Sequence, residues 1–397
     1  MKAVTEKIPE LRFPEFDGEW SEERLGDISE RISSGRSDTK SSSGGFLVYG
    51  STGVIGCTDS PEYSGESVLV ARVGANAGSL YKVEGHYGVS DNTLILKTLD
   101  GSCFEWIYYF LKKENLNRLV FGSGQPLITG RQLKNLKIRF PDFYEQKKIA
   151  SFLSSIDRRI EGLEKKRELL KGYKKGLMQK LFNQSLRFGN GTNPFPKWEQ
   201  RSFASLYDFE STNSYSRDML NYEVGTVKNV HYGDIHTKFK SQFSIAKEKV
   251  PSIDLSPVRK GQYLQEGDLI IADASEDYAD IGKSIEVVDL SGAKAVAGLH
   301  TILARRKSAD EMAIGFAAYL MQSENVKLSI MRVAQGTKVL GLSPTRFGAI
   351  EVKIPHPDEQ KKITDCLSAL DRKIEQVETQ VLQTQDFKQG LLQKMFV

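Results

Sequence analysis

Residues 145–182 read EQKKIASFLSSIDRRIEGLEKKRELLKGYKKGLMQKLF, and residues 359–396 read EQKKITDCLSALDRKIEQVETQVLQTQDFKQGLLQKMF. Aligned without a gap, the two stretches are identical at 18 of 38 positions. Each follows a proline-bearing turn and contains no proline, so each is predicted to form one long helix. A helix of this length would extend about 57 Å, which is longer than the usual helix of a globular protein.

Apolar residues recur along both stretches in alternating steps of three and four, the spacing of a coiled-coil seam. A helix cannot bury such a seam alone, and the nearest partner for each copy is the other copy. The predicted seam consists of Ile149, Leu153, Ile156, Ile160, Leu163, Leu170, Leu177 and Leu181 in the first copy, and Ile363, Leu367, Leu370, Ile374, Val377, Val381, Leu391 and Met395 in the second. Two surface helices that pack separately on their own domains are the alternative.

Polar residues interrupt the seam at Arg167 and Lys174 in the first copy and at Thr384 and Lys388 in the second. Such residues cost stability but fix the register and the partner of a coiled coil. Residues 145–180 also carry eleven Lys and Arg against five Asp and Glu, whereas the second copy balances six against six. A solvated helix face is the ordinary interpretation of this charge, and a strip that faces phosphates is the alternative.

Shorter motifs flank both helices in the same order. The repeated motifs are Leu-Arg-Phe at 11–13 and 186–188, the tryptophans Trp20 and Trp198, the helical segments 108–115 and 318–325, and the alternating strands LKIRFP at 136–141 and IEVKIP at 350–355. The order of elements is therefore the same twice, with a globular segment followed by a long helix. The globular segments are otherwise dissimilar, as expected for one scaffold that carries two exchangeable parts.

The composition is that of a protein with ordinary apolar cores. A length of 397 residues allows two or three domains. No run approaches the roughly eighteen apolar residues of a membrane span, and the first residues lack the apolar run of a signal peptide. Cys57, Cys103 and Cys366 have no metal-binding spacing, which indicates reduced thiols and a cytoplasmic protein. The net charge of +4 does not by itself indicate nucleic acid.

Candidate catalytic patterns are all incomplete. Pro141-Asp142 with Glu145 and Lys147 has the residue types of a metal-dependent nuclease, but only two residues part the two carboxylates at a helix start, and the second copy has no aspartate at the matching position. Helix capping by Glu145 and Glu359 is therefore the favoured interpretation. Gly282-Lys283-Ser284 lacks the first glycine of a phosphate loop. Asn193-Pro194-Phe195-Pro196 lacks a proline of the adenine-methyltransferase tetrad, and the five histidines form no metal-binding pattern. The sequence therefore predicts no catalytic residue and no metal site.

Glycine-rich loops joined to short strands are the remaining signal, at 49–56, 74–78 and 281–284. Glycine lets a backbone approach a ligand closely, and the residue types beside these loops contact phosphates and base edges in DNA. An ordinary surface role is the alternative for each residue, and the duplicated layout favours nucleic acid. The candidate DNA-binding residues are Arg36, Lys40, Ser51, Thr52, Arg72, Asn76, Lys82, Asn92, Gln125, Lys228, Asn229, His231, Lys238, Lys240, Lys283, His300 and Lys338.

The complete order of motifs resembles the specificity subunit of type I restriction-modification enzymes. The order is LRF, Trp20, LGDI at 25–28, GSGQ at 122–125, a strand ending in proline, EQKKI, and GLMQKLF at 176–182, with most of it repeated once. The second half departs from this pattern, because 334–337 read AQGT instead of GSGQ and no full LGDI follows Trp198.

The resemblance implies an α+β chain with two globular α/β target recognition domains in tandem, related by a pseudo-twofold internal repeat. Two long conserved helices that form an antiparallel coiled coil would separate them. Each domain would bind one half of an interrupted, asymmetric sequence in double-stranded DNA. Two modification subunits, which bind S-adenosylmethionine and methylate adenine, and two restriction subunits, which use ATP and Mg²⁺, would dock on this chain, which is itself not an enzyme and holds no cofactor.

The predicted boundaries are 1–144 for the first target recognition domain, 145–185 for the first long helix, 186–357 for a linker with the second domain, and 358–397 for the second long helix. A stand-alone DNA-binding or architectural coiled-coil protein is the alternative function. A modification subunit that is encoded beside the chain or purifies with it would distinguish the two. That the chain is itself a nuclease rests only on the incomplete pattern that begins at Pro141.

Overall fold

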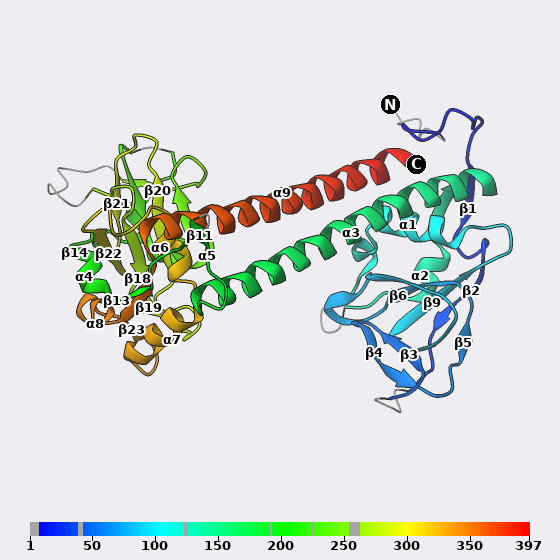
Figure 1. The fold of residues 1–397 in the computed structure, drawn as a ribbon. Helices are drawn as coiled ribbons and strands as arrows, with labels where there is room; N and C mark the ends of the chain where they lie inside the picture. Colours follow the sequence, from blue (N-terminus) through cyan, green and yellow to red (C-terminus); the bar gives the residue numbers. More distant parts are fainter. Residues whose placement is uncertain (1–7, 39–42, 123–125, 191–192, 224, 254–262) are drawn as a thin grey trace. The chain divides into compact units, whose positions relative to one another are not determined.

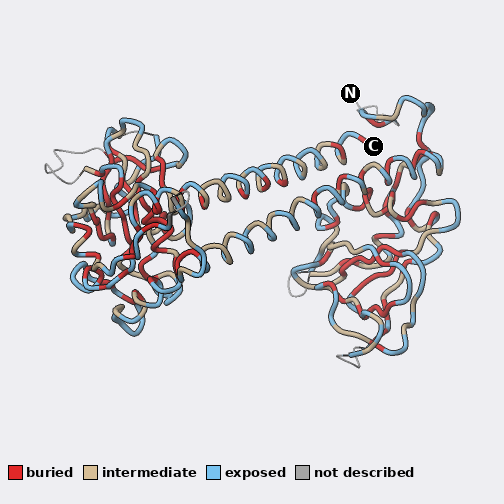
Figure 2. Tube along the Cα trace, in the orientation of Figure 1, coloured by how far each residue is buried: buried red, intermediate tan, exposed pale blue. Residues whose placement is uncertain are grey.

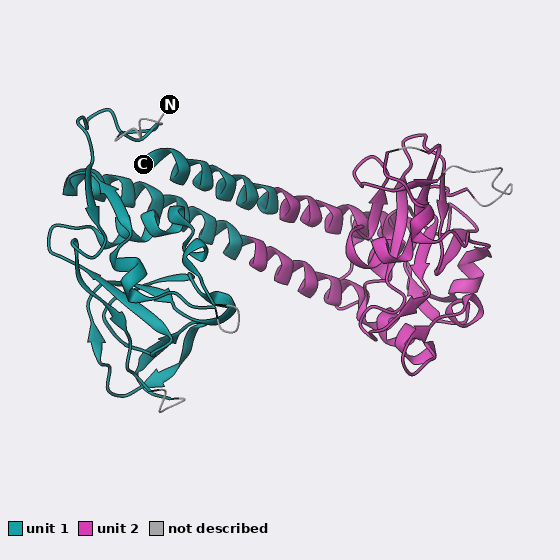
Figure 3. Cartoon of the chain, turned by 180° about the vertical axis from the view of Figure 1, so that it is seen from behind, with its two compact units in different colours: residues 1–166, 377–397 teal, residues 167–376 magenta. Residues whose placement is uncertain are grey.

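The structure is a computed structural model that describes residues 8–38, 43–122, 126–190, 193–223, 225–253 and 263–397. The chain divides into two compact units, which we call unit 1 (residues 1–166 and 377–397) and unit 2 (residues 167–376) (Figure 3). Each unit contains one part of each long helix together with a mixed body of strands and short helices (Figure 1). Among the helices described, none is long and apolar enough to cross a membrane.

Unit 1 is built on two four-stranded sheets. Its strands are β1 (Ser21–Arg24), β2 (Ser29–Ser34), β3 (Phe46–Gly50), β4 (Gly53–Thr58), β5 (Tyr63–Ser64), β6 (Ser67–Ala71), β7 (Leu80–Val83), β8 (His86–Val89), β9 (Thr93–Thr98) and β10 (Lys137–Phe140). Its short helices are η1 (Gly74–Asn76), α1 (Phe104–Glu114), η2 (Leu116–Leu119) and α2 (Gly130–Lys134). The strand orders are β2-β9-β6-β7 and β4-β3-β8-β5, and β1 pairs with β10.

Unit 2 has a five-stranded and a three-stranded sheet. Its strands are β11 (Gly189–Asn190), β12 (Asn193–Pro194), β13 (Glu199–Ser202), β14 (Tyr207–Glu210), β15 (Val227–Val230), β16 (Gln242–Ser244), β17 (Ser252–Ile253), β18 (Leu269–Ala272), β19 (Ala274–Ser275), β20 (Ser284–Asp289), β21 (Ala295–Ala297), β22 (Thr301–Arg306), β23 (Leu340–Gly341) and β24 (Glu351–Ile354). Its short helices are α4 (Phe203–Leu206), η3 (Arg217–Met219), α5 (Tyr232–Thr237), α6 (Phe316–Leu320), α7 (Glu324–Val333) and α8 (Pro344–Gly348). The sheet orders are β14-β22-β18-β20-β16 and β17-β15-β21, and two-strand pairs join β13 to β24, β19 to β23 and β11 to β12.

Both units contain the same arrangement of three antiparallel strands, which we call the frame. In unit 1, β6 lies between β9 and β7, and in unit 2, β18 lies between β22 and β20, with antiparallel pairing throughout. Ala71 pairs with Thr93, and Ala272 pairs with Thr301, so these pairs occupy the same place in the two frames. The pairing of β1 with β10 matches that of β13 with β24. The duplication therefore extends into the globular bodies, although their sequences differ.

Continuous apolar runs form the central strands of both frames. All residues of β6 (SVLVA) and of β18 (LIIA) are buried, which is typical of strands covered on both faces. In unit 1, Val68 and Val70 of β6 share an apolar cluster with Trp106 and Phe110 of α1, while Leu69 belongs to a separate cluster. Buried positions gather in the strands of each unit (Figure 2).

The long helices α3 (Phe143–Phe182) and α9 (Pro357–Met395) pack antiparallel within each unit, because the start of one lies against the end of the other. The seam residues that join the apolar core of unit 1 are Ile149, Leu153, Ile156, Ile160, Leu391 and Met395, and those that join or flank the core of unit 2 are Leu177, Leu181, Ile363, Leu367 and Leu370. The alternative of two separately packed surface helices is therefore wrong.

In the middle of the predicted seam, the residues of the two helices are not equally buried. Ile374, Val377 and Val381 of α9 are buried, whereas Leu163 and Leu170 of α3 are half-buried. Because each long helix belongs to both compact units, the units cross the predicted boundaries at 144, 185 and 357. The division into domains at those boundaries stays a prediction.

Candidate nucleic-acid interface

The glutamate that opens α3 is a buried ion-pair partner. Glu145 has no exposed surface, and its two carboxylate oxygens accept hydrogen bonds from Arg12 at 2.8 and 2.7 Å. Backbone N–H groups of Tyr144 and Glu145 donate instead to Asp142. The prediction that Glu145 caps the helix is therefore wrong, because the planar guanidinium group of Arg12 matches both carboxylate oxygens. Both oxygens of Glu145 are thus engaged by Arg12.

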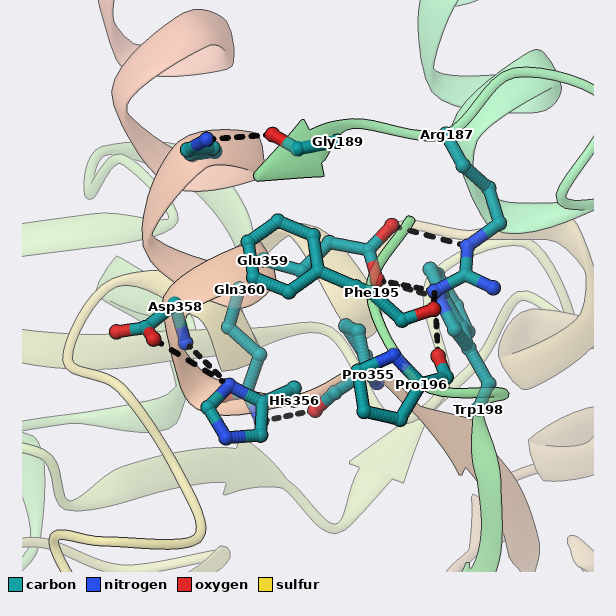
Figure 4. A network of polar contacts seen from close by, with 11 residues as sticks. Arg187, Gly189, Phe195, Pro196, Trp198, Pro355, His356, Asp358, Glu359 and Gln360 are labelled. Carbon is teal, nitrogen blue, oxygen red and sulfur yellow. Dashed lines mark hydrogen bonds and ion pairs between the residues drawn. The ribbon is translucent and has the colours of Figure 1, made fainter. Parts of the chain in front are cut away.

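The second copy repeats this ion pair with one addition (Figure 4). Arg187 donates to the two oxygens of the fully buried Glu359 at 3.1 and 2.6 Å. Trp198 Nε1 also donates to Glu359, at 3.2 Å. The first turn of α9 is capped by His356, whose Nδ1 accepts from the backbone of Asp358, so the capping role predicted for Glu359 is wrong for the same reason.

The glutamine that follows each glutamate ties the helix to its unit. Gln146 accepts a hydrogen bond from the Cys103 backbone and donates to the Pro141 carbonyl, both at 2.9 Å. Gln360 accepts from the Ala313 backbone and donates to the Pro355 carbonyl, also at 2.9 Å. Buried amides that satisfy buried backbone groups in this way fix one geometry. The identical Glu-Gln letters of the two copies therefore have the same structural role.

The lysine that interrupts the seam at the end of α9 has a partner on α3. In unit 1, Lys388 pairs with Asp157, which also accepts a hydrogen bond from the Tyr109 hydroxyl at 2.7 Å. The Lys388 ammonium lies 5.2 Å from the centroid of the Tyr109 ring. Burial raises the pKa of the Tyr109 hydroxyl, so it remains a donor to Asp157.

The same three residue types meet in unit 2. Lys174 of α3 donates to Asp371 of α9 at 2.6 Å, and Asp371 accepts from the Tyr319 hydroxyl at 2.7 Å. Lys174 lies 5.1 Å from the Tyr319 ring centroid, and burial raises the pKa of Tyr319. Each lysine is thus an interhelical contact that specifies the antiparallel register, as expected for a polar residue in a seam.

Three of the candidate DNA-binding residues converge in unit 1, and we call them corner 1 (Ser51, Arg72 and Asn92). The Asn92 carbonyl accepts from the Arg72 backbone at 2.9 Å and from the Ser51 hydroxyl at 2.6 Å. The Tyr81 hydroxyl donates to the Ser51 carbonyl at 3.1 Å. The Nε of Arg72 is buried and has no hydrogen-bond partner among the residues described.

The other candidates of unit 1 lie outside corner 1. Arg36 is exposed beyond the end of β2, Thr52 is exposed in the turn after Ser51, and Asn76 is exposed in η1. Lys82 is exposed on β7, with its ammonium 5.0 Å from the ring centroid of Tyr108. Lys40 and Gln125 lie outside the residues that the structure describes.

A second group converges in unit 2, and we call it corner 2 (Asp273, Lys283 and His300). The Asp273 backbone donates to the His300 carbonyl at 3.1 Å, and His300 Nδ1 lies 3.4 Å from Asp273 Oδ1. The Lys283 carbonyl accepts from the Ala272 backbone at 2.9 Å, and its ammonium donates to the His236 carbonyl at 2.5 Å. His300 has a positive φ of 55°, which is uncommon outside glycine. Burial raises the pKa of Asp273.

Two candidates of unit 2 are buried near the start of α5. Asn229 is fully buried in β15, and neither of its amide atoms has a partner in the described part of the chain. His231 caps α5, with its Nδ1 accepting from the Gly233 backbone at 3.1 Å. Burial, followed by the charge of Arg217, lowers the pKa of His231, so the ring is neutral and able to accept at neutral pH.

The remaining candidates of unit 2 are lysines. Three of them bond to other residues of the protein, and one is exposed. Lys228 donates to the Ser252 hydroxyl at 2.9 Å, Lys238 pairs with Asp234 at 2.9 Å, and Lys240 pairs with Glu375 at 2.7 Å. Lys338 is exposed in the loop before β23. No group of three His, Cys, Asp or Glu suited to a metal occurs in the described ranges.

Comparison with known proteins identifies the family of this chain. Residues 17–171 and 197–384 match the family described as "Type I restriction modification DNA specificity domain". The chain belongs to this family. It is 26% identical over 327 residues to the specificity subunit of the type I restriction enzyme MjaVIII of Methanocaldococcus jannaschii, which covers 78% of this chain and 73% of that protein.

Solved structures show the same fold. The crystal structure of the S subunit of a type I restriction-modification system from M. genitalium has a TM-score of 0.64 at 17% identity, covering 98% of this chain and 99% of that one. A chain from a study of complex assembly and conformational transition of the type I R-M system has a TM-score of 0.56 at 15% identity, covering 95% and 97%. The predicted family and α+β fold class, with two domains in tandem, are confirmed.

Specificity subunits of this family are non-catalytic and act on DNA together with methyltransferase and restriction subunits in a type I complex. The candidate DNA-binding residues of this specificity subunit stay predictions. Asp273, which the structure places in corner 2, is not among the residues predicted from the sequence, because no acidic residue was a candidate for DNA contact. Its signal was position, since Asp273 follows the strand LIIA as Arg72 follows the strand VLVA.

Proposed function

We propose that unit 1 and unit 2 of this specificity subunit each read one half of an interrupted, asymmetric sequence in double-stranded DNA. The observation that carries the proposal is the repetition of one frame with unlike side chains at corner 1 and corner 2. A common scaffold with different loop residues is suited to two different half-sites, because loops carry recognition while the scaffold positions them.

Catalysis and cofactors belong to the partner subunits in this proposal. S-adenosylmethionine would bind to two modification subunits, which methylate adenine, and ATP and Mg²⁺ would bind to two restriction subunits. The chain would contribute base and phosphate contacts in the cytoplasm, where phosphate contacts hold the DNA and base contacts select its sequence.

A duplicated exposed aromatic residue supports two docking positions for modification subunits. Tyr173 of α3 in unit 2 is 62% exposed, and Phe387 of α9 in unit 1 is 57% exposed. The two residues occupy the same position in the two copies of the long helix. Exposed aromatic side chains are enriched at the centres of protein interfaces, so each unit would offer one anchor to one modification subunit.

The methylome of a strain tests the function. Expression of this chain with the modification subunit encoded beside it should produce N6-methyladenine at one bipartite motif. The same strain without this chain should lack the motif. Methylation by the chain alone, or an unchanged methylome without it, would contradict the proposal.

Native mass spectrometry of the assembled complex tests the docking positions. Tyr173→Ala and Phe387→Ala should each reduce the bound modification subunits from two toward one, and the double variant should retain none. Leu382→Ala is the matched control, because Leu382 is 62% exposed on α9 and the first copy has Glu168 at its position. Two bound modification subunits in the double variant would contradict the assignment.

A further inference from the structure

Arg72 and Asp273 occupy the same backbone position in the two frames. Each follows the central strand, and its N–H donates to the carbonyl of the residue before the next strand of the frame, Asn92 at 2.9 Å or His300 at 3.1 Å. Their carbonyls accept from the backbones of Ile128 and Leu342, respectively, both at 2.8 Å. Four backbone hydrogen bonds therefore superpose two positions whose side chains carry opposite charge.

The residues that flank the loop beside each corner also pair in the same way. In unit 1, Phe121 and Leu127 exchange two backbone hydrogen bonds at 3.2 and 3.0 Å, and in unit 2, Gln335 and Gly341 do so at 2.9 and 2.6 Å. Each of these loops precedes the residue that donates to Arg72 or Asp273. The described residues at these positions therefore share their backbone pairing, and the corners differ in their side chains and in the backbone of His300, which has a φ of 55°.

The side chains at the two positions have complementary hydrogen-bonding capacity. Arg72 is donor-only, and its buried Nε has no partner in the residues described. Asp273 is an acceptor, and its contact with His300 Nδ1 orients the ring so that Nε2 is directed away from the carboxylate. The backbone of His300 is held at φ 55°, and strained residues of this kind cluster at functional sites.

An aspartate in corner 2 argues against a phosphate contact there. DNA phosphates repel a carboxylate, whereas the amino groups of cytosine and adenine donate to acceptors at the base edge. If corner 2 meets DNA, Asp273 therefore meets a base. Because Arg72 stands at the same backbone position, it meets a base too, and its donors match the O6 and N7 acceptors of guanine.

We infer that Arg72 and Asp273 are equivalent specificity-determining residues, each selecting one base pair in its own half-site. Arg72 would select guanine. Asp273, with His300 as its positioning residue, would select a base that presents an amino group, which is cytosine or adenine. The inference rests on the proposed DNA-reading function and deepens it by naming one base contact in each unit.

Methylome mapping of the assembled methyltransferase tests the inference with Arg72→Gln and Asp273→Asn. Arg72→Gln should relax or change one position in one half-site, with relative methylation of the original base falling roughly tenfold to a hundredfold. Asp273→Asn should do the same in the other half-site alone. His300→Gln should weaken the preference at the same position as Asp273→Asn, because it acts through that carboxylate.

Two equivalent residues at the far end of the same frames provide controls. Arg31 pairs with Lys97 on β9, and Asp208 pairs with Arg305 on β22, which places both about 13 Å along the strand from the corner at 3.3 Å per residue. Arg31→Gln and Asp208→Asn make the same charge changes and should leave the motif unchanged.

The outcomes separate the inference from the proposed function. A complete bipartite motif that keeps every base in Arg72→Gln and Asp273→Asn would overturn the inference and leave the function intact. Uniform loss of methylation at all sites would also overturn it, provided that circular dichroism and assembly match the control variants, because a phosphate contact weakens all sequences alike. If a variant fails to fold, Arg72→Lys and Asp273→Glu, which keep the charge, should still shift the preference at one position.

Discussion

Unit 1 and unit 2 anchor their long helices by similar polar contacts, but among the described residues unit 2 adds hydrogen bonds from Trp198 to Glu359 and from Gln360 to the Glu311 carbonyl. Trp198 Nε1 donates to Glu359 at 3.2 Å, whereas Trp20 Nε1 is buried without a partner in the described residues. The ion pairs with Arg187 and Arg12 are otherwise alike. Buried polar contacts are therefore nearly fixed between the units, since an unpaired buried group is costly.

The corners differ far more than the anchors. Corner 1 carries Arg72 where corner 2 carries Asp273, on the same backbone hydrogen bonds. Arg72 and Asp273 are half-buried, whereas Glu145 and Glu359 are fully buried, so substitutions in the corners should cost less stability than substitutions in the anchors. The two units therefore repeat the contacts that hold the helices and differ at the residues proposed to contact DNA.

Removal of the buried glutamates should have the largest effect on stability. Glu359→Ala leaves Arg187 and Trp198 unpaired and should cost about 3 to 4 kcal/mol, because a buried ion pair has lost one partner. Glu145→Ala should cost about 1 kcal/mol less, since only Arg12 loses its partner. Hydrogen exchange in the first turns of α9 and α3 measures the two costs separately. Equal costs would mean that the tryptophan contact does not matter.

The stability of unit 2 should depend on pH in a way that the stability of unit 1 does not. Burial raises the pKa of Glu286 to about 7 from its ordinary value of 4.5, although its carboxylate accepts from the backbones of Gly315 and Ala318. The folded unit thus binds the proton more tightly than the unfolded chain. This group contributes stability that is full below pH 4.5 and is lost as the pH rises through 7, about 3 kcal/mol in all.

Hydrogen exchange of α6 and β20 between pH 4.5 and 7.5, corrected for the intrinsic exchange rate, measures this loss. Lys82 of β7 is the counterpart of Glu286 in the frame of unit 1, and unit 1 should lack this contribution. Glu286→Gln should flatten the profile of unit 2. A variant that kept the wild-type pH dependence would assign the effect to another group.

Substitution of the two tryptophans should lower the stability of their units by different amounts, and this difference is smaller than the effects above. Trp198→Phe removes a hydrogen bond to a charged carboxylate as well as ring volume, whereas Trp20→Phe removes volume and relieves an unpaired N–H. The first substitution should cost about 1 to 2 kcal/mol more than the second. Chemical denaturation monitored by hydrogen exchange within each unit gives both values, and a larger cost for Trp20→Phe would reverse the comparison.

The ion pairs of the interhelical lysines should contribute least to stability, and their contributions should be nearly equal in the two units. Double-mutant cycles for Lys174 with Asp371, and for Lys388 with Asp157, should each give a coupling of about 1 kcal/mol, because these pairs are partly buried and share the aspartate with a tyrosine. Arg167 and Glu168, which pair as neighbours on α3, provide a control with coupling near zero. Unequal couplings in the two units would show that the repeated contacts are not energetically equivalent.

Much of the scaffold is predictable from the sequence because it is repeated. Proline-free copies with a 3-4 apolar spacing predict the two long helices, and the lysines at 174 and 388 predict polar contacts in the seam. The partners of those lysines are not predictable from spacing, since Asp371 and Asp157 lie on the other helix. The burial of Glu145 and Glu359 also escapes prediction, because glutamate at a helix start is usually an exposed charge near the dipole.

The corners are less predictable because tertiary pairing creates them. Ser51, Arg72 and Asn92 meet through one carbonyl, although 41 residues separate Ser51 from Asn92. Their residue types suggested DNA contacts, but the equivalence of Arg72 with Asp273 required the strand registers. The candidates predicted from the sequence contain no acidic residue, so Asp273 was not among them.

Exchange of one reader tests the central claim most directly. Residues 203–350, which lie between β13 and β24, would be replaced by the corresponding segment of another specificity subunit with a different target, leaving both long helices unchanged. The account predicts a methylome motif in which one half-site is new and the other is unaltered. A motif in which both half-sites change, or in which neither changes, would contradict the claim that each unit reads its own half of the DNA sequence.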